Sequence, residues 1–308
     1  MKIEILNRLF HIDRVFLRAV KNCICAIVVV ISIASCSEYN KVLKSTDTEL
    51  KYTKAVEYFN KGEYYKSLPI FEELIGVTRG SQRAEDVQFY FARCQYGVQD
   101  YYLANYYLKT FAKSFPSSPR SEECLFLAAE CSYNLSPGYT LDQTETRSAI
   151  DEYQLFLDQY PGSHLKDSAS HRIEDLSFKL EKKKFEIARQ YATTMRYNAA
   201  VMALNDFLKE YPASKFREEA MFLIVKSRYE HAIGSIESKK MDRLHLVSES
   251  FHNFANSFPE SEMLKDAESY HKKAVRELAK SSSETVNITD NWYEYLQKFN
   301  STQVNDDA

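Results

Sequence analysis

Histidine and cysteine side chains are the residues of this 308-residue chain that could bind a metal ion or act as a nucleophile. The pairs His164/His171 and His245/His252 each stand seven residues apart, which is about 10 Å along a helix. That separation is wide for shared metal ligation, and no cysteine or carboxylate completes a ligand set. Cys94 has no basic neighbour beyond one arginine, which favours a packed side chain over a nucleophile. The sequence therefore predicts solvent-facing histidines and neither a catalytic residue, a metal site nor a cofactor.

Carboxylate pairs are the remaining candidates for acid–base chemistry. Three of them occur, Glu72-Glu73, Glu122-Glu123 and Glu218-Glu219. They are interpreted as charges of a helix first turn or of a solvated helix face. The chain has no glycine-rich phosphate loop and no helical H-E-x-x-H motif, and its net charge of −3 gives no electrostatic reason to propose nucleic acid. We therefore expect a protein that is not an enzyme and whose function depends on its surface.

Cys36 offers a different chemistry, because its thiol could carry lipid. An uncharged segment, residues 23–34, follows a basic stretch; at about 18 Å it is too short to span a bilayer core of about 30 Å. Such a pattern is typical of a cleaved secretory signal. The residues Ile33-Ala34-Ser35-Cys36 resemble the bacterial lipobox. This resemblance implies that residues 1–35 are removed and that acyl chains on Cys36 hold the protein at a membrane; the alternative is an ordinary signal cut nearby.

The chain after the signal keeps few thiols and begins with polar residues. Residues 36–48 are interpreted as a lipidated tether. Cys124 and Cys131 stand seven residues apart on a predicted helix, too far for a disulfide. Together with Cys94 they are expected to be small buried apolar residues.

The helices that follow are predicted from one recurring sequence motif, F-x4-P-x-S, which we call the joint. The four joints are Phe111/Pro116/Ser118, Phe156/Pro161/Ser163, Phe207/Pro212/Ser214 and Phe254/Pro259/Ser261. The residue before Pro is driven out of the helical region, so a helix ends there. The Ser can then cap the next helix. Each joint is therefore predicted to connect two helices.

Around these joints the chain resembles a tetratricopeptide array, with small residues such as Ala92 and Ala104 where paired helices approach closely. The predicted fold is all-α: a solenoid over residues 49–281 of about five tetratricopeptide-like helix pairs and a C-terminal capping helix. The predicted repeats are 49–82, 84–117, 121–162, 169–213 and 217–260, followed by a capping helix at 262–281. Insertions are expected at 136–146 and 234–243, and one long helix at 176–195. An irregular helical bundle is the alternative.

The polar tail, residues 282–308, contains one aromatic stretch at 291–300. That stretch is either a short helix for docking a partner or one that packs on the last repeat.

Tetratricopeptide stacks present residues of each first helix on a concave groove. The corresponding positions are Tyr52, Val56 and Phe59 in the first repeat, Phe89, Arg93 and Tyr96 in the second, and Phe185 and Arg189 in the fourth. Aromatic side chains with an arginine could bind an extended or hairpin peptide and a carboxylate. The alternative is that some of these residues pack between repeats.

The lipobox, the polar segment and the repeats together resemble the BamD family, the lipoproteins of the outer-membrane β-barrel assembly machinery. The resemblance covers roughly residues 36–280 and is most specific at 182–212. It implies a scaffold anchored to the outer membrane on its periplasmic face. The C-terminal half would bind the periplasmic domains of a BamA-like barrel protein, and the N-terminal repeats would bind unfolded outer membrane proteins. Cys36, as the lipid attachment residue, is the only residue of this chain to which the resemblance assigns a defined role.

Two departures from the family pattern concern the partner surfaces: the first repeat lacks its Pro, and the 291–300 stretch is additional. The competing interpretation is another lipidated periplasmic adaptor of the tol-pal/YbgF type. That family usually carries an N-terminal coiled coil, and no heptads occur between residues 37 and 50.

Overall fold

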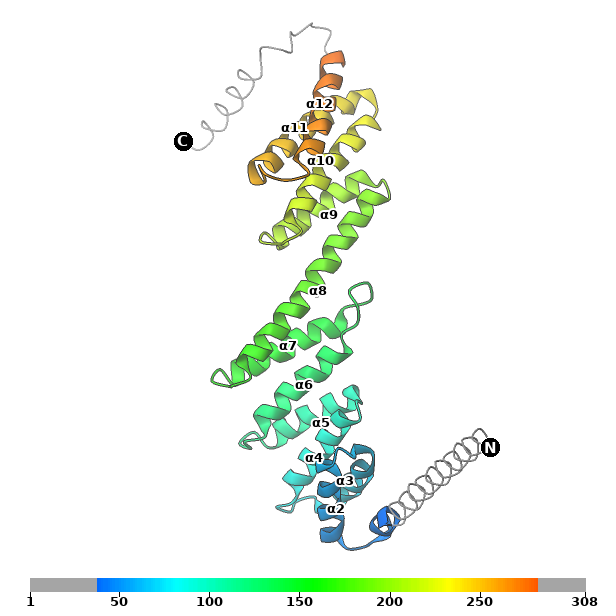
Figure 1. The fold of residues 1–308 in the computed structure, drawn as a ribbon, viewed down its shortest axis with the longest axis vertical. Coiled ribbons are helices and arrows are strands. Elements are labelled where there is room, and N and C mark those ends of the chain that lie inside the picture. Colours follow the sequence, from blue (N-terminus) through cyan, green and yellow to red (C-terminus); the bar gives the residue numbers. More distant parts are fainter. Residues whose placement is uncertain (1–37, 282–308) are drawn as a thin grey trace, which may run out of the picture. The chain divides into compact units, whose positions relative to one another are not determined.

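The computed structural model describes residues 38–281 (Figure 1). Within this range all regular secondary structure is helical, which confirms the all-α prediction. The chain divides after Ser177 into an N-terminal unit and a C-terminal unit, each with its own internal contacts. The signal segment, Cys36 and the tail at 282–308 lie outside the described residues.

The N-terminal unit starts with a short helix at 38–44. It continues with α2 (Thr48–Asn60), α3 (Tyr64–Thr78), α4 (Ala84–Gly97), α5 (Tyr101–Ser114), α6 (Ser121–Leu135) and α7 (Thr144–Gln159). The C-terminal unit contains α9 (Tyr197–Glu210), α10 (Arg217–Ile233), α11 (Glu237–Ser257) and α12 (Leu264–Ser281). Helices adjacent in the chain pack against each other, as the order of α2 to α7 in Figure 1 shows.

Helix α8 (Lys166–Thr193) runs without interruption for 28 residues across the division between the units. Its first part contributes Ala169 and Leu176 to the core of the N-terminal unit. Its later part contributes Phe185 and Ala188 to the core of the C-terminal unit. The prediction of one long helix is confirmed, and the helix begins earlier than expected because no breaker separates the second joint, which ends at Ser163, from it.

Small residues lie where the helices of each unit approach most closely. Ala92 and Ala104 are fully buried in one cluster with Leu108 and Phe111. Gly97 ends α4 against the ring of Tyr64, and a Cβ at this position would lie 2.4 Å from Tyr64 Cδ2. The spacing of small residues in the sequence thus corresponds to close helix contacts.

The expected insertions take two different forms. Residues 136–143 connect α6 to α7 without a helix, and the buried Gln143 side chain donates hydrogen bonds to the carbonyl oxygens of Gly138 and Leu141, both at 2.9 Å. Most of residues 234–243 instead extend α11 to 21 residues. The second insertion therefore lengthens a helix, because the segment contains no residue that would end one after Ile236.

The segment expected to be a tether folds onto the first two repeat helices. Residues 38–44 form a helix whose Val42 is only 4 % exposed and belongs to the core around α2 and α3. The ring of Tyr39 lies edge-on to Tyr58 at 5.7 Å, and the Tyr39 hydroxyl donates to the Lys66 carbonyl at 3.3 Å. We call residues 38–44 the N-terminal helix.

The four joints share one hydrogen-bonding pattern. The aromatic residue before each Pro ends its helix and donates its N–H to the carbonyl of the joint Phe, at 2.9 Å for Phe115 to Phe111. The carbonyl oxygen of the same aromatic residue accepts a hydrogen bond from the N–H of the joint Ser, at 2.9 Å for Ser118 to Phe115. Equivalent bonds occur in the other three joints, which explains why the spacing in the sequence is constant.

The joint serine makes two further contacts through its hydroxyl. In all four joints it accepts the N–H of the residue two positions on, which lies just before the next helix. The joint serine is therefore not the N-cap that the sequence predicts: the N-cap residues of α6 and α10 are Arg120 and Phe216, and neither makes a side-chain capping bond. In three joints the hydroxyl also donates to a glutamate of the preceding first helix: Ser118 to Glu85 at 2.6 Å, Ser163 to Glu122 at 2.5 Å and Ser214 to Glu181 at 2.5 Å. The turn is therefore fixed to the helix that opens the same repeat.

Replacing Ser214 with Ala should lower the free energy of unfolding of the C-terminal unit by about 1–2 kcal/mol. The change removes the acceptor of the Phe216 N–H, at 2.9 Å, and the donor to Glu181. Urea denaturation followed by circular dichroism measures the effect, with Ser257→Ala, at an exposed position of α11, as the matched control. Equal midpoints for the two variants would contradict this role of the joint serine.

Candidate peptide-binding site

Six residues predicted to line a groove lie on α2 and α4 of the N-terminal unit. Tyr52, Val56 and Phe59 repeat at helical spacing on α2 and are half-buried. On α4, Arg93 and Tyr96 are half-buried, whereas Phe89 is only 8 % exposed.

The structure brings Phe59, Phe89 and Arg93 together. The guanidinium carbon of Arg93 lies 5.8 Å from the ring centre of Phe59 and 5.8 Å from that of Phe89. Both distances are within the range of a cation–π contact. The same guanidinium forms an ion pair with Glu123 in the first turn of α6. Arg93 therefore joins α2, α4 and α6, with 27 % of its side chain still exposed.

The other predicted residues lie at the two sides of this cluster. The ring of Tyr52 lies under the guanidinium of Arg83 at 4.2 Å, and burial, followed by the charge of Asp86, raises the Tyr52 pKa above its usual value. Tyr96 packs edge-on against Tyr101 of α5 at 5.8 Å. Val56 packs against the core around α2 and α3.

The fourth-repeat residues repeat the arrangement in the C-terminal unit. Arg189 lies 5.9 Å from the ring centre of Phe185 and forms an ion pair with Glu219 at 3.6 Å. Phe185 is 1 % exposed. Like Glu123 in α6, Glu219 lies in the first turn of its helix, α10. For the two phenylalanines the structure thus shows packing between helices, which was the alternative interpretation.

Two arginines beside the groove were missed from sequence. Arg83 pairs with Glu49 at 2.8 Å, and Arg120 pairs with Asp86 at 2.6 Å while lying 4.7 Å from the ring centre of Phe89. Each stands directly before a first helix, α4 or α6. The sequence contained a signal for these two arginines, because they occupy the same position in successive repeats.

An open pocket of about 760 Å³ adjoins Tyr52. Its walls come from α2, the end of α3 and the start of α4, and they include Leu74, Val77, Arg83 and Asp86. Val77 is 61 % exposed. The pocket therefore combines apolar and charged groups and is large enough for a side chain of a bound peptide.

The cysteines among residues 38–281 lie in the helical core and are not reactive. Cys94, Cys124 and Cys131 are buried and not in disulfides, as predicted. Burial raises the pKa of the Cys94 thiol to about 11 and those of Cys124 and Cys131 to about 12. These thiols are protonated at neutral pH and are not activated nucleophiles.

Histidines and carboxylates in the described range likewise form no cluster of three that could hold a metal ion. His164, His171 and His245 are exposed, as predicted. His252 is half-buried instead, because it packs against Phe251 and His271 between α11 and α12. The carboxylate pairs at 122–123 and 218–219 lie in helix first turns, and Glu73 pairs with Lys51 at 2.6 Å.

Among the described helices none has both the length and the apolar character needed to cross a membrane. Cys36, the predicted lipid attachment residue, precedes the described range.

Comparisons with known proteins place these features in a family. The sequence profile of YfiO, described as an outer membrane lipoprotein, matches residues 44–242 and 180–298. The chain is 22% identical over 202 residues to the outer membrane protein assembly factor BamD of Haemophilus influenzae, covering 62% of this chain and 77% of that protein. It is 20% identical over 218 residues to the protein of the same name from Pasteurella multocida, covering 68% and 84%.

Among solved structures, the chain is similar to the TPR domain of P58(IPK), with a TM-score of 0.37 and 13% identity over 80% of this chain and 69% of that one. The profile match covers more than half of the chain and includes all four joints. This protein therefore belongs to the YfiO family of outer membrane lipoproteins.

Proposed function

We propose that this protein is a non-enzymatic scaffold subunit of the machinery that assembles β-barrel proteins in the outer membrane. The observation that carries the proposal is the YfiO profile match across both units, joined to a lipobox that ends at Cys36. Family relatives are named as outer membrane protein assembly factors. In this proposal α2 to α11 form five tetratricopeptide-like pairs and α12 caps the last one.

The proposed location is the periplasmic face of the outer membrane, with acyl chains on Cys36 as the anchor. Mass spectrometry of the purified mature chain should show acylated Cys36 at its N-terminus, and Cys36→Ser should abolish lipid labelling. Labelling that persists in Cys36→Ser would remove the anchor from the proposal.

The proposed partners are a BamA-like barrel protein, bound through its periplasmic domains by the C-terminal half, and unfolded outer membrane proteins, bound by the N-terminal repeats. Affinity purification from detergent-solubilised outer membranes tests the first partner. A large β-barrel protein with periplasmic domains should co-purify at a stoichiometric level. If proteins of the tol-pal system co-purify in its place, the chain is the competing lipidated adaptor.

The proposed peptide site is the exposed part of the groove around Phe59, Arg93 and Tyr96, with the Tyr52 pocket at one side. A barrel C-terminal peptide offers apolar side chains and a terminal carboxylate. The carboxylate can replace Glu123 as the partner of Arg93, since 27 % of the arginine side chain and 42 % of the glutamate side chain are exposed.

Arg93→Gln should weaken binding of barrel C-terminal peptides about tenfold, the effect of one lost charge-assisted hydrogen bond. Glu123→Gln should strengthen binding, because it frees the guanidinium. Fluorescence anisotropy with a labelled peptide measures both effects. Phe89 is not substituted in these variants. It is buried, so its truncation would change the stability of the fold as well as peptide binding.

The matched control is Arg189→Gln, which removes the equivalent ion pair in the C-terminal unit and should leave peptide affinity unchanged. If Arg93→Gln and Arg189→Gln bind the peptide equally, the site is not at the α2–α4 groove.

A further inference from the structure

The N-terminal helix leaves almost no free chain between the lipid attachment residue and the folded protein. Cys36 stands two residues before Glu38, and two residues span at most about 7 Å when extended. The headgroup layer on each side of a bilayer is about 5–8 Å thick. With lipid on Cys36, the surface around residue 38 therefore lies within or against the headgroups. This step rests on the lipid attachment of the proposed function.

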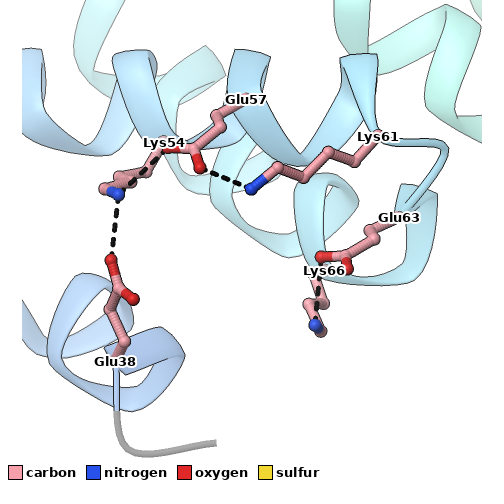
Figure 2. Close-up of polar contacts among 6 residues, drawn as sticks. All are labelled: Glu38, Lys54, Glu57, Lys61, Glu63 and Lys66. Carbon is pink, nitrogen blue, oxygen red and sulfur yellow. Dashed lines mark hydrogen bonds and ion pairs between the residues drawn. The ribbon is translucent and has the colours of Figure 1, made fainter. Parts of the chain in front are cut away.

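The N-terminal helix is held on the first repeat by buried and polar contacts. Val42 is 4 % exposed, and Leu43 packs against the same core. Glu38 accepts a hydrogen bond from Lys54 of α2 at 2.9 Å, and Lys54 also bonds Glu57 at 3.0 Å (Figure 2). The helix therefore cannot act as a spacer without losing these contacts.

The surface next to this attachment point is basic with an apolar edge. An open hollow of about 540 Å³ is lined by three lysines, Lys41, Lys44 and Lys54, and by Val42 and Leu50. Glu38 also lines it and pairs with Lys54, so among the described residues of the hollow the unpaired positive charges are those of Lys41 and Lys44. Lys41 and Lys44 are exposed, and neither forms an ion pair with a residue of the described range. Leu50 is 42 % exposed. Ammonium groups beside an apolar side chain suit phosphate headgroups above acyl chains.

We propose that the N-terminal helix seats the first repeat directly on the bilayer, with Lys41 and Lys44 binding anionic phospholipid headgroups and Leu50 entering the interface. The lipid anchor and this surface then act together, as a single acyl signal and a basic patch do in other anchored proteins. The consequence is a fixed orientation of the first repeat toward the membrane.

Quenching of tryptophan fluorescence by brominated lipids tests the proposal. The chain contains one tryptophan, so Trp292→Phe provides a silent background. In that background Leu50→Trp reports the proposed membrane surface, and Leu141→Trp, at a residue that is 61 % exposed in the connection between α6 and α7 of the same unit, is the matched control. The lipidated mature chain is reconstituted into vesicles that contain brominated phosphatidylglycerol.

We expect the Leu50→Trp emission to fall by at least half and the Leu141→Trp emission to stay unchanged. Adding Lys41→Gln and Lys44→Gln should remove most of the quenching in anionic vesicles. Val42→Asp should remove it as well, because releasing residues 36–47 gives a tether of up to about 40 Å. Equal quenching at positions 50 and 141, or quenching that neither change reduces, would overturn the proposal.

A second sample separates failure of this inference from failure of the lipid anchor. The chain that starts at Cys36 is coupled through that thiol to a maleimide phospholipid already in the vesicles. The coupling is selective because Cys94, Cys124 and Cys131 are buried. Quenching of Leu50→Trp in this sample supports the seating even if native acylation is absent, and its absence overturns the seating even if native acylation is found.

Discussion

Replacing Arg172 with Met should lower the free energy of unfolding of the N-terminal unit by about 3 kcal/mol. The reason is the carboxylate of Glu130, a residue only 9 % exposed. It accepts hydrogen bonds from Arg172 Nε at 2.9 Å and from the Tyr153 hydroxyl at 2.5 Å. Without the arginine this carboxylate is left buried without a counter-charge. Methionine keeps much of the side-chain volume beside Tyr133, over whose ring the guanidinium lies at 4.0 Å.

Urea denaturation of the mature chain at pH 7 measures this effect. Glu130→Gln combined with Arg172→Met should recover a large part of the loss, because the buried charge disappears with its partner. Lys272→Met is the matched control: its partner Glu268 is 47 % exposed and lies on the same helix, so the expected change is below about 0.5 kcal/mol. A loss of similar size in Lys272→Met and Arg172→Met would show that burial of Glu130 is not the cause.

Lowering the pH from 7 to 4 should destabilise the C-terminal unit by up to about 3 kcal/mol through His271. This histidine is 4 % exposed and stacks on Phe251 at 4.6 Å. Burial, with a smaller effect of His252, lowers the His271 pKa from 6.5 to about 4. Of the other charged groups facing it, Lys272 acts in the same direction and Glu268 opposes them.

The direction in which the free energy of unfolding changes with pH follows from proton binding. Above pH 6.5 His271 is neutral in the folded and the unfolded chain, so it adds no pH dependence. Between pH 6.5 and 4 the unfolded chain binds a proton that the folded chain does not, and the free energy of unfolding falls as the pH falls. His252, whose pKa is also lowered by burial, adds to the same trend.

Denaturation midpoints at a series of pH values test this prediction. His271→Phe should flatten the curve between pH 4 and 6.5, since phenylalanine can stack on Phe251 and cannot be protonated. His245→Gln, at an exposed position of α11, should leave the slope unchanged. A wild-type slope retained in His271→Phe would exclude this histidine as its source.

The helical fold could be predicted because its signals are local. The aromatic-Pro-x-Ser joint depends on bonds between residues at most five apart, such as Ser118 N–H to Phe115 and Phe115 N–H to Phe111. The alanines at close helix contacts follow from the same register. The N-terminal helix was missed because residues 38–44 are mostly polar, and docking depends on three side chains, those of Tyr39, Val42 and Leu43.

The candidate site was predicted only in part, because some of its contacts join residues that are far apart in the sequence. Register places Phe89 and Arg93 on one face of α4, yet it reveals neither the burial of Phe89 nor the pairing of Arg93 with Glu123 of the next repeat. The bond from Arg172 to Glu130 spans 42 residues and follows no repeated spacing. Contacts of this kind depend on how successive repeats pack against each other. The residue pattern within a single repeat carries no information on that packing.

The serine–glutamate bond of the joints has a consequence for how the chain reaches its folded state. In three joints the bond returns to the helix that opened the same repeat, and the longest of these bonds spans 41 residues. Closing such short segments loses little chain entropy compared with pairing distant parts of the sequence. Each repeat can therefore form its own contacts before the following repeat has folded, so folding can proceed stepwise from the N-terminus.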